Sequence, residues 1–480
     1  MPDRLADRVR PLRGRTDRAA AGHSYDPGVP SSPPDPRPSD HAADLDDRAA
    51  GLEVRPFRAL TYSSPDPAHL ARVTSPAYDL VTAAGRDRLA DSDPHNIVRL
   101  ILPQVDGAGA PAPPLVAGPP PWASQAARTL HAWEDDGVLI RDDVPALWVY
   151  ELQPPGDEAA TVGWLAAVGI PGPGSAAVLP HEDTFPVAVE GRRALLAATR
   201  TDLEPIVLAH DADPVVTELT QRAVQVAPTL ELRDDDGVRH RLWRVSDPGV
   251  IAELTAAMVR TGAVIADGHH RFAAARAHQR ADPGCSGCDA VLALLTPMGP
   301  GGLRVAAIHR VLPELTLDDA AAAAAADFAV TDVPLPGTSA APAAVAAAVA
   351  GWLARSDGSG FLVSDGRRLV QLDRPSPSVV ARVPPEAPDV WRRLDVVLAH
   401  KGLIEGLWGR SDQPGDVLIA HTVDEALRTA VERSGVALLL RPPSPADVAD
   451  VARAGARMPR KSTLFVPKPR TGLVLRPLAD

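Results

Sequence analysis

The chain has 480 residues and a formal net charge of −12 at pH 7. A chain of this length can bury a large core, and its acidic balance argues against a general nucleic-acid or membrane-surface binder. No apolar run approaches the roughly 18 residues of a transmembrane helix, and the N-terminal sequence lacks the apolar region of a signal peptide. We therefore expect a soluble, cytoplasmic protein with no membrane partner.

Composition divides the chain into three parts. Residues 1–50 are rich in Pro, Asp, Arg and Ser and almost without large apolar side chains, so we expect a disordered tail. Residues 51–315 carry most of the polar motifs and are expected to form the functional core. Residues 316–480 are expected to form an accessory α+β region that ends in a basic segment. The fold class predicted is α+β, with mixed α/β layers.

Hydrophobic patterns predict the secondary structure in chain order. In the core, helices are expected over 82–90 and 122–134, and a continuous apolar run predicts a buried strand over 96–102. Further strands are expected over 146–152 and 162–168, paired as a hairpin, and over 206–209, 239–245, 263–266, 289–295 and 306–312. In the accessory region, helices are expected over 318–328, 341–355 and 391–407, and strands over 360–363 and 369–372.

A polar loop follows the apolar residues Val178 and Leu179. It contains His181 and Glu182, and catalytic groups often lie on such loops. Glu182 is a candidate general base, and His181 is a candidate partner for phosphate or metal. A solvated turn capped by Asp183 or Thr184 is the alternative interpretation.

The strongest motif is Asp-Gly-His-His-Arg at residues 267–271, between the strand 263–266 and an Ala-rich helix that starts near Phe272. A strand that passes into a helix through Gly268 leaves backbone N–H groups at the helix N-terminus, which favour a bound phosphate. Arg271 is expected to clamp phosphate oxygens. His269 or His270 would donate to the same oxygens or move a proton, and His270 is the candidate catalytic histidine. Asp267 is a candidate catalytic carboxylate and Mg²⁺ ligand.

Two alternatives remain for this motif. Asp-Gly is ordinary turn chemistry, and a His pair at a helix start can simply hydrogen-bond the backbone. A zinc or iron site on Asp267, His269 and His270 is disfavoured, because adjacent histidines on one helical turn point in different directions.

Two further cations are candidates for the same anion. Arg310 lies with His309 inside an apolar strand, where charge is usually avoided, although an edge strand with one solvated face would explain it too. The chain has only three lysines against many arginines, and two of them, Lys461 and Lys468, lie in the basic C-terminal segment. A lysine kept in such a chain suggests that a compact ammonium is needed. Lys461, beside Ser462 and Thr463, is expected to close over phosphates, with a solvated basic turn as the alternative.

The only cysteines are Cys285 and Cys288, in a Gly-Cys-Ser-Gly-Cys loop. A single Cys-x-x-Cys can be half of a metal site or a redox pair, but the sequence offers no second pair to complete a zinc site. We expect a surface loop with free thiols.

The motifs occur together in an order that resembles a known family. RPFRAL at 55–60, NIVRLILP at 96–103, VLPHEDT at 178–184, ADGHHR at 266–271, IHRVL at 308–312 and RMPRKSTLFVPKPRTGLV at 457–474 resemble the family called domain of unknown function 1015. The resemblance runs from about residue 52 to the C-terminus. The family name itself implies no function.

The DGHHR motif is also similar to the phosphate-binding box of the ParB/sulfiredoxin fold, and implies a nucleotide-binding core of that kind. Sulfiredoxins have a cysteine in this box, which the chain lacks, and ParB proteins have a different box that binds CTP. The most similar version is that of the free serine kinases. It implies that Asp267 is a catalytic or Mg²⁺ carboxylate, that His269, His270 and Arg271 contact phosphate, and that Glu182 is the base. Glu182 lies much farther from the box than in those kinases, which puts its equivalence in doubt.

The resemblance therefore implies a kinase that transfers a phosphoryl group from ATP, with Mg²⁺, to the hydroxyl of a small hydroxy amino acid, serine by analogy. The phosphate-binding residues found above suit such a reaction. ATP or ADP would be the nucleotide, and a homodimer is compatible with the resemblance. The alternative is a ParB-like nucleotide switch without kinase activity. A degenerate structural protein is a third, less favoured interpretation, because the box is intact.

Overall fold

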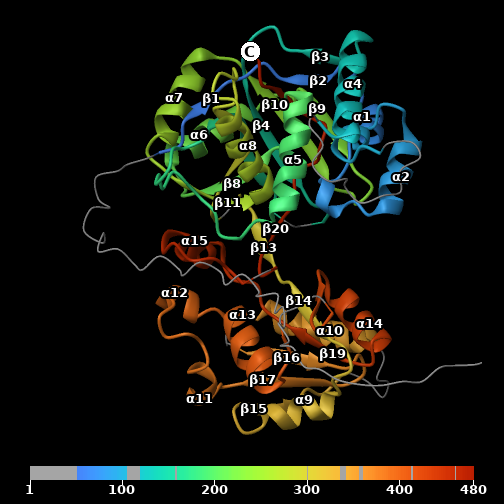
Figure 1. The fold of residues 1–480 in the computed structure, drawn as a ribbon, viewed down its shortest axis with the longest axis vertical. Helices are drawn as coiled ribbons and strands as arrows, with labels where there is room; N and C mark the ends of the chain where they lie inside the picture. Colours follow the sequence, from blue (N-terminus) through green and yellow to red (C-terminus); the bar gives the residue numbers. More distant parts are fainter. Residues whose placement is uncertain are drawn as a thin grey trace, which may run out of the picture. The chain divides into compact units, whose positions relative to one another are not determined.

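The computed structural model describes residues 51–104, 119–156, 159–299, 301–335, 342–355, 360–411, 415–459 and 461–479. The expected tail over 1–50 lies outside these residues. The described part has the mixed α/β fold that the sequence predicts (Figure 1). No helix in these ranges is both long and apolar enough to cross a membrane.

The core is built on a nine-stranded mixed sheet with the order β6-β11-β8-β12-β5-β4-β10-β9, and β1 also pairs with β5. The expected hairpin is present, because β4 and β5 pair antiparallel. The strands are β1 (Val54–Arg55), β4 (Leu147–Gln153), β5 (Thr161–Gly169), β6 (Val178–Leu179), β8 (Ile206–His210), β9 (Leu230–Arg233), β10 (Arg239–Val245), β11 (Ala263–Asp267) and β12 (Ala290–Pro297).

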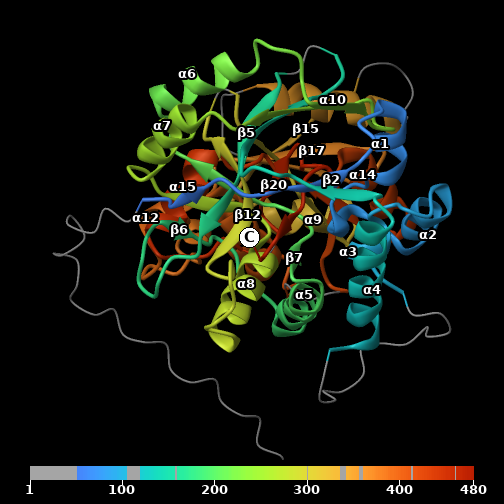
Figure 2. The same ribbon diagram turned by 90° about the horizontal axis from the view of Figure 1, so that it is seen from above.

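Helices cover both faces of this sheet, so its central strands are apolar on both sides. In β8, Ile206 and Leu208 belong to one core, and Val207 and Ala209 belong to the other. Helices α5 and α8 pack side by side (Figure 1), and α6 lies beside α7 (Figure 2). The helices of this region are α1 (Pro67–Val73), α2 (Ala83–Ser92), α3 (Val98–Ile101), α4 (Pro121–Asp135), α5 (Pro186–Thr199), α6 (Pro214–Ala223), α7 (Pro248–Met258) and α8 (His269–Ala281), with a 3-10 turn at Tyr78–Leu80.

A second, six-stranded sheet has the order β15-β17-β16-β19-β14-β18. Its strands are β14 (His309–Leu312), β15 (Ala329–Asp332), β16 (Phe361–Ser364), β17 (Leu369–Asp373), β18 (Leu418–Ala420) and β19 (Val436–Leu439). The helices that follow β14 are α9 (Leu317–Ala324), α10 (Pro342–Ala354), α11 (Pro377–Val380), α12 (Asp389–Arg392), α13 (Asp395–Leu398), a π-helix (Ala399–Leu407), α14 (Val423–Glu432) and α15 (Pro445–Arg453).

The C-terminal segment returns to the first region through short strand pairs. β20 (Leu464–Val466) pairs with β13 (Arg304–Ala306), and β21 (Arg476–Pro477) pairs with β7 (Thr201–Asp202). A further small sheet joins β2 (Leu60–Tyr62) to β3 (Leu139–Arg141). The division at residue 315 stays a prediction, and residues 464–477 belong structurally with strands that precede it.

Four expectations about local structure were wrong. The apolar run 96–102 forms the short helix α3, because the side chain of Asn96 accepts the backbone N–H of Val98 and closes a helical turn. The segment 306–312 is divided between β13 and β14, and Arg310 lies between β18 and β19 in the second sheet, not at an edge. The segment 391–407 is three short helical pieces. The cysteines are not free thiols but form a disulfide, which the 5.5 Å separation of their Cα atoms allows.

Candidate active site around the Asp-Gly-His-His-Arg box

The sheet brings the loop containing Glu182 next to the box. β6 pairs parallel with β11, in the register Ala263 to Val178 and Val264 to Leu179. Parallel strands end at the same edge of a sheet, so the residues that follow β6 meet those that follow β11. Glu182 and Asp267 are 85 positions apart, which made their association doubtful from sequence. The residues between them form other strands of the sheet and the helices α5, α6 and α7.

Asp267 is held at the end of β11 by two cations. The pairing of β11 with β8 shifts register between Ile265 and Asp267, an irregularity of the kind that re-aims a side chain at a strand end. One carboxylate oxygen accepts from Arg271, and the other lies 2.7 Å from the ammonium of Lys468. Only 14% of the Asp267 side chain is exposed. The carboxylate is therefore fixed in place by charge-assisted hydrogen bonds.

Lys468 is the residue at this site whose role the sequence did not reveal. Its side chain is 8% exposed, and its ammonium bridges the carboxylates of Asp267 and Asp79. Burial lowers the pKa of Lys468, but the two carboxylates outweigh it and raise that pKa above the ordinary 10.5. Burial raises the pKa of Asp79, but Lys468 and Arg271 hold it below its ordinary value. The rarity of lysine was a signal for Lys468, and nothing in the sequence singled out Asp79.

Gly268 adopts a left-handed conformation between Asp267 and α8, with φ of +94°. A Cβ atom there would come within 2.8 Å of Ile206 Cγ2. Glycine is thus needed both for the backbone conformation and for the close approach. The turn points the N-terminus of the 13-residue helix α8 toward the end of β11, where its first N–H groups have no partners within the helix.

Gly268→Ala is expected to lower the free energy of unfolding by at least the roughly 1–2 kcal/mol that a left-handed conformation costs a residue with a Cβ. Urea denaturation of the variant would measure this. Gly284→Ala is the matched control, because no atom lies within 4 Å of its Cβ position and its φ is ordinary. Equal stability of the two variants would contradict the strain argument.

The histidines of the two motifs hold the loop against the box. The backbone N–H of His181 donates to His269 Nε2 over 3.3 Å, and the two rings meet edge to face at 4.6 Å. The backbone N–H of Phe185 donates to His270 Nε2, and the Phe185 ring stacks on His270. Burial lowers the pKa of His269 well below 6.5, so it is neutral and accepts. His269 is therefore placed to position the loop, and phosphate contact by its Nε2 would require that bond to open.

Glu182 is the end of a hydrogen-bonded chain. Thr463 Oγ1 donates to Glu182 Oε1 over 3.2 Å, and the same hydroxyl lies 3.0 Å from His181 Nε2. Burial lowers the pKa of His181 to about 4, so the ring is neutral and its Nε2–H can donate to the hydroxyl. Burial also raises the pKa of Glu182 above its ordinary 4.5. A partly buried carboxylate with a raised pKa is what a general base near neutral pH requires.

Lys461 and Arg310 have different roles here. Arg310 is 0% exposed, and its guanidinium donates to the backbone carbonyl of Lys461 and to His400 Nε2. Because Arg310 is buried and holds these two partners, the phosphate contact that the sequence predicted would require one of these bonds to open. Lys461 is exposed, has a left-handed φ of +54°, and its charge acts on both Glu182 and His270. Arg310 thus stabilises the strained turn that presents Lys461.

Arg271 also has partners other than Asp267. Besides Asp267, its guanidinium donates to the carbonyl of Pro205 and lies 5.7 Å from the Tyr78 ring, over which Arg192 packs at 3.6 Å. A cavity of about 50 Å³ lies beside Arg271 and Arg192. For Arg271 to clamp a phosphate, as the sequence predicted, one of these bonds would have to be exchanged.

The oxygen donors at the site fit Mg²⁺ in kind. Asp79, Asp267 and Glu182 are carboxylates, the hard ligands that this ion prefers. Between the first two the structure places the Lys468 ammonium, a cation in a position of high negative potential. The three carboxylates are therefore the residues that could hold a magnesium ion.

Comparisons with known proteins agree with the sequence motifs. The model of a protein family described as "Protein of unknown function (DUF1015)" matches residues 54–397. No curated protein matches the chain.

Solved structures give weaker likenesses. SbnI with a C-terminal truncation, from Staphylococcus aureus, has 13% identity and a TM-score of 0.33, covering 65% of this chain and 87% of that chain. A free serine kinase in complex with AMP has 11% identity and a TM-score of 0.29, covering 65% and 91%. A variant of free serine kinase with ADP has 11% identity and a TM-score of 0.30, covering 65% and 92%. Likenesses with such low TM-scores assign no function to this chain.

Proposed function

This chain belongs to the DUF1015 family, whose description assigns no function, and we propose that it is an ATP-dependent, Mg²⁺-requiring kinase for the hydroxyl of a small hydroxy amino acid, serine by analogy. The observation that supports this most is the meeting of Glu182, Asp267 and Lys468 beside the N-terminus of α8. A base, a fixed carboxylate and an ammonium at a helix N-terminus are the minimum set for phosphoryl transfer.

Each group has a role that follows from its surroundings. Glu182 would accept the proton of the substrate hydroxyl, because burial raises its pKa and Thr463 orients it. The N-terminus of α8 and the lysines would neutralise charge on the transferred phosphoryl group. The ammonium of Lys468 would exchange its contact with Asp79 for one with a phosphate oxygen.

Magnesium would be held by Asp267, with Asp79 as the second candidate ligand. When bound, it would neutralise the phosphate oxygens of the nucleotide. Arg271 would keep Asp267 in place, because their ion pair is buried and the guanidinium is anchored on Pro205.

A nucleotide-dependent switch without transfer chemistry is the second candidate. The same helix N-terminus and cations would bind a nucleotide in such a protein. A carboxylate with a raised pKa at this place favours the kinase, since a binding switch has no need of a base.

Calorimetric titration of the protein with ATP, ADP and CTP in Mg²⁺ would test both. We expect ATP and ADP to bind, and ³¹P NMR to show a new phosphomonoester when L-serine is added. Asp267→Ala should lose both signals, whereas Asp183→Asn, which changes an exposed carboxylate of the same loop, should keep them. CTP binding without product would favour the switch, and no nucleotide binding would contradict both.

A further inference from the structure

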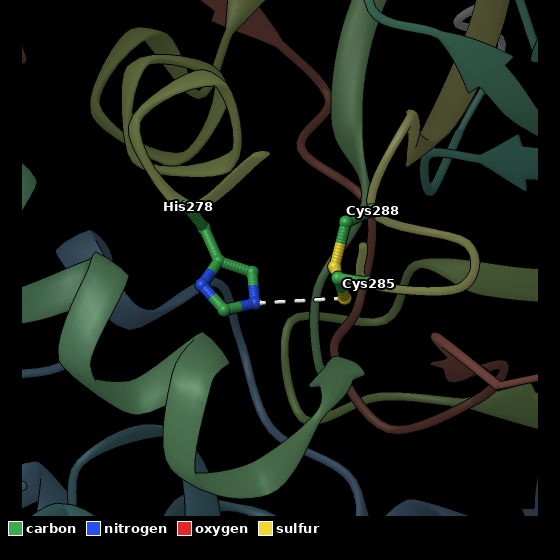
Figure 3. A group of neighbouring side chains, drawn as sticks. All are labelled: His278, Cys285 and Cys288. Atoms are coloured by element: carbon green, nitrogen blue, oxygen red, sulfur yellow. Dashed lines mark hydrogen bonds between the residues drawn. A yellow bond between two sulfur atoms is a disulfide. The ribbon is translucent and has the colours of Figure 1, made fainter. Parts of the chain in front are cut away.

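A second cluster of chemically reactive side chains lies at the other end of α8. The loop between α8 and β12 contains Cys285 and Cys288, which the sequence left without partners for a metal. The last turn of α8 supplies one, because His278 lies there and is 6% exposed. Its Nε2 lies 4.0 Å from Cys285 Sγ, and Figure 3 shows the ring directed at the sulfur atoms.

The three ligand atoms form a compact set. His278 Nε2 and the two Sγ atoms lie within 4.8 Å of one another. A tetrahedral zinc ion with bonds of about 2.1–2.3 Å needs its ligands roughly 3.5–4 Å apart, so small side-chain rotations would satisfy it. Cys288 is 4% exposed, while Cys285 is more accessible, which leaves one side of the set open.

The surroundings favour thiolates in a fixed loop. Arg200 Nη2 donates to Cys285 Sγ over 3.4 Å, a contact that stabilises negative charge on the sulfur. Gly287 has a φ of +71°, and a Cβ there would lie 1.8 Å from the carbonyl oxygen of Leu478. The turn between the cysteines is thus pinned to the C-terminal segment, so the loop presents both sulfur atoms to His278 in one arrangement.

We propose that the dithiol form of Cys285 and Cys288, together with His278, is a zinc site with water in its fourth position. Two thiolates and one neutral imidazole are ligands that zinc prefers, and they balance its charge. The disulfide in the structure is the metal-free, oxidised form of the same site. Zinc would then fasten the loop 282–289 to α8, the helix that begins at the DGHHR box.

A phosphine reduces the disulfide form to the dithiol form. A phosphine attacks the disulfide and breaks the S–S bond, water supplies the oxygen of the phosphine oxide, and each sulfur gains one proton. Zinc binding releases those two protons as the thiolates form. In a cell, a dithiol reductant would supply the same two electrons and two protons.

Metal titration of the full-length chain would test the site. The protein is reduced with a phosphine, its two thiols are counted, and Zn²⁺ is added in competition with a chromophoric chelator. We expect one zinc per reduced chain and none on the oxidised chain. Cobalt in place of zinc is expected to show sulfur-to-metal charge transfer and tetrahedral ligand-field bands.

Substitutions identify the ligands. His278→Gln is expected to weaken zinc binding by more than the roughly 10–100-fold typical of an outer-sphere partner. It leaves both cysteines intact, so it keeps the test decisive even if the cysteine variants fold poorly. Arg280→Gln, an exposed change in the same helical turn, should bind as the wild type does. Asp267→Asn should also keep full zinc stoichiometry, which separates this site from the proposed magnesium site.

Two results would overturn the zinc site. One is a fully reduced chain that leaves zinc on the chelator and gives cobalt no charge-transfer band. The other is undiminished binding in the Cys285→Ser/Cys288→Ser double variant, which would place the metal elsewhere.

Discussion

Replacing Glu182 by glutamine is expected to lower kcat for phosphoryl transfer by about 10²–10⁴-fold, the usual contribution of a general base, while ATP binding stays within a few-fold of the wild type. The amide keeps the size of the side chain and can still accept from Thr463, so the loop should stay folded. Steady-state kinetics with L-serine and calorimetry with ATP would measure the two effects. Asp183→Asn is the matched control, because the Asp183 side chain is 90% exposed.

The pH profile gives an independent check on the same residue. Burial raises the pKa of Glu182, so the carboxylate forms at a higher pH than an ordinary glutamate with a pKa of 4.5. Activity should therefore rise with pH through the pKa of Glu182 and be lost below it. Thr463→Val removes a hydrogen bond that favours the charged form, so the rising limb should move to higher pH. If the pH profile were unchanged in both Thr463→Val and Glu182→Gln, the base would have to be another group.

The sequence predicted the parts of the site that are local in the chain. A strand, a glycine and an Ala-rich helix are readable from pattern, and the structure has β11, Gly268 and α8 in that order. The helix begins at His269, three residues before the predicted Phe272, so both histidines of the box lie in its first turn. The loop with His181 and Glu182 was readable as polar residues after an apolar pair. Their mutual position was not, because it depends on the parallel pairing of β6 with β11, which two short strands cannot specify by pattern alone.

Long-range partners explain the remaining differences. Asp79 and Lys468 are 389 positions apart, and no local pattern connects them. His278 lies only seven residues before Cys285, but it is on the preceding helix and is not part of a second cysteine pair, the pattern that indicates a zinc site in sequence. Arg310 stands out in the sequence as a charge within an apolar strand, but its partner, the carbonyl of Lys461, is 151 positions away and no local pattern connects the two.

Lys468→Met is expected to lower the free energy of unfolding by about 2–3 kcal/mol. Removing one member of a buried ion pair usually costs about 3–5 kcal/mol, and the cost is smaller here because Asp79 is 37% exposed. The variant leaves Asp79 and Asp267 without the cation that they share, and only Arg271 remains with Asp267. Urea denaturation would measure the loss, and calorimetry would measure the expected loss of ATP affinity.

Two further variants separate the buried network from a general effect of losing a lysine. Lys401→Met makes the same change in a more exposed pair with Glu405, and should cost less than about 0.5 kcal/mol. In Asp79→Asn/Lys468→Met, the neutral amide no longer repels Asp267, so the double variant should be about 1–2 kcal/mol more stable than the sum of the single effects predicts. If the two single effects on the free energy of unfolding were strictly additive, Asp79 and Lys468 would not interact. A stable Lys468→Met variant with full ATP affinity would remove Lys468 from the site.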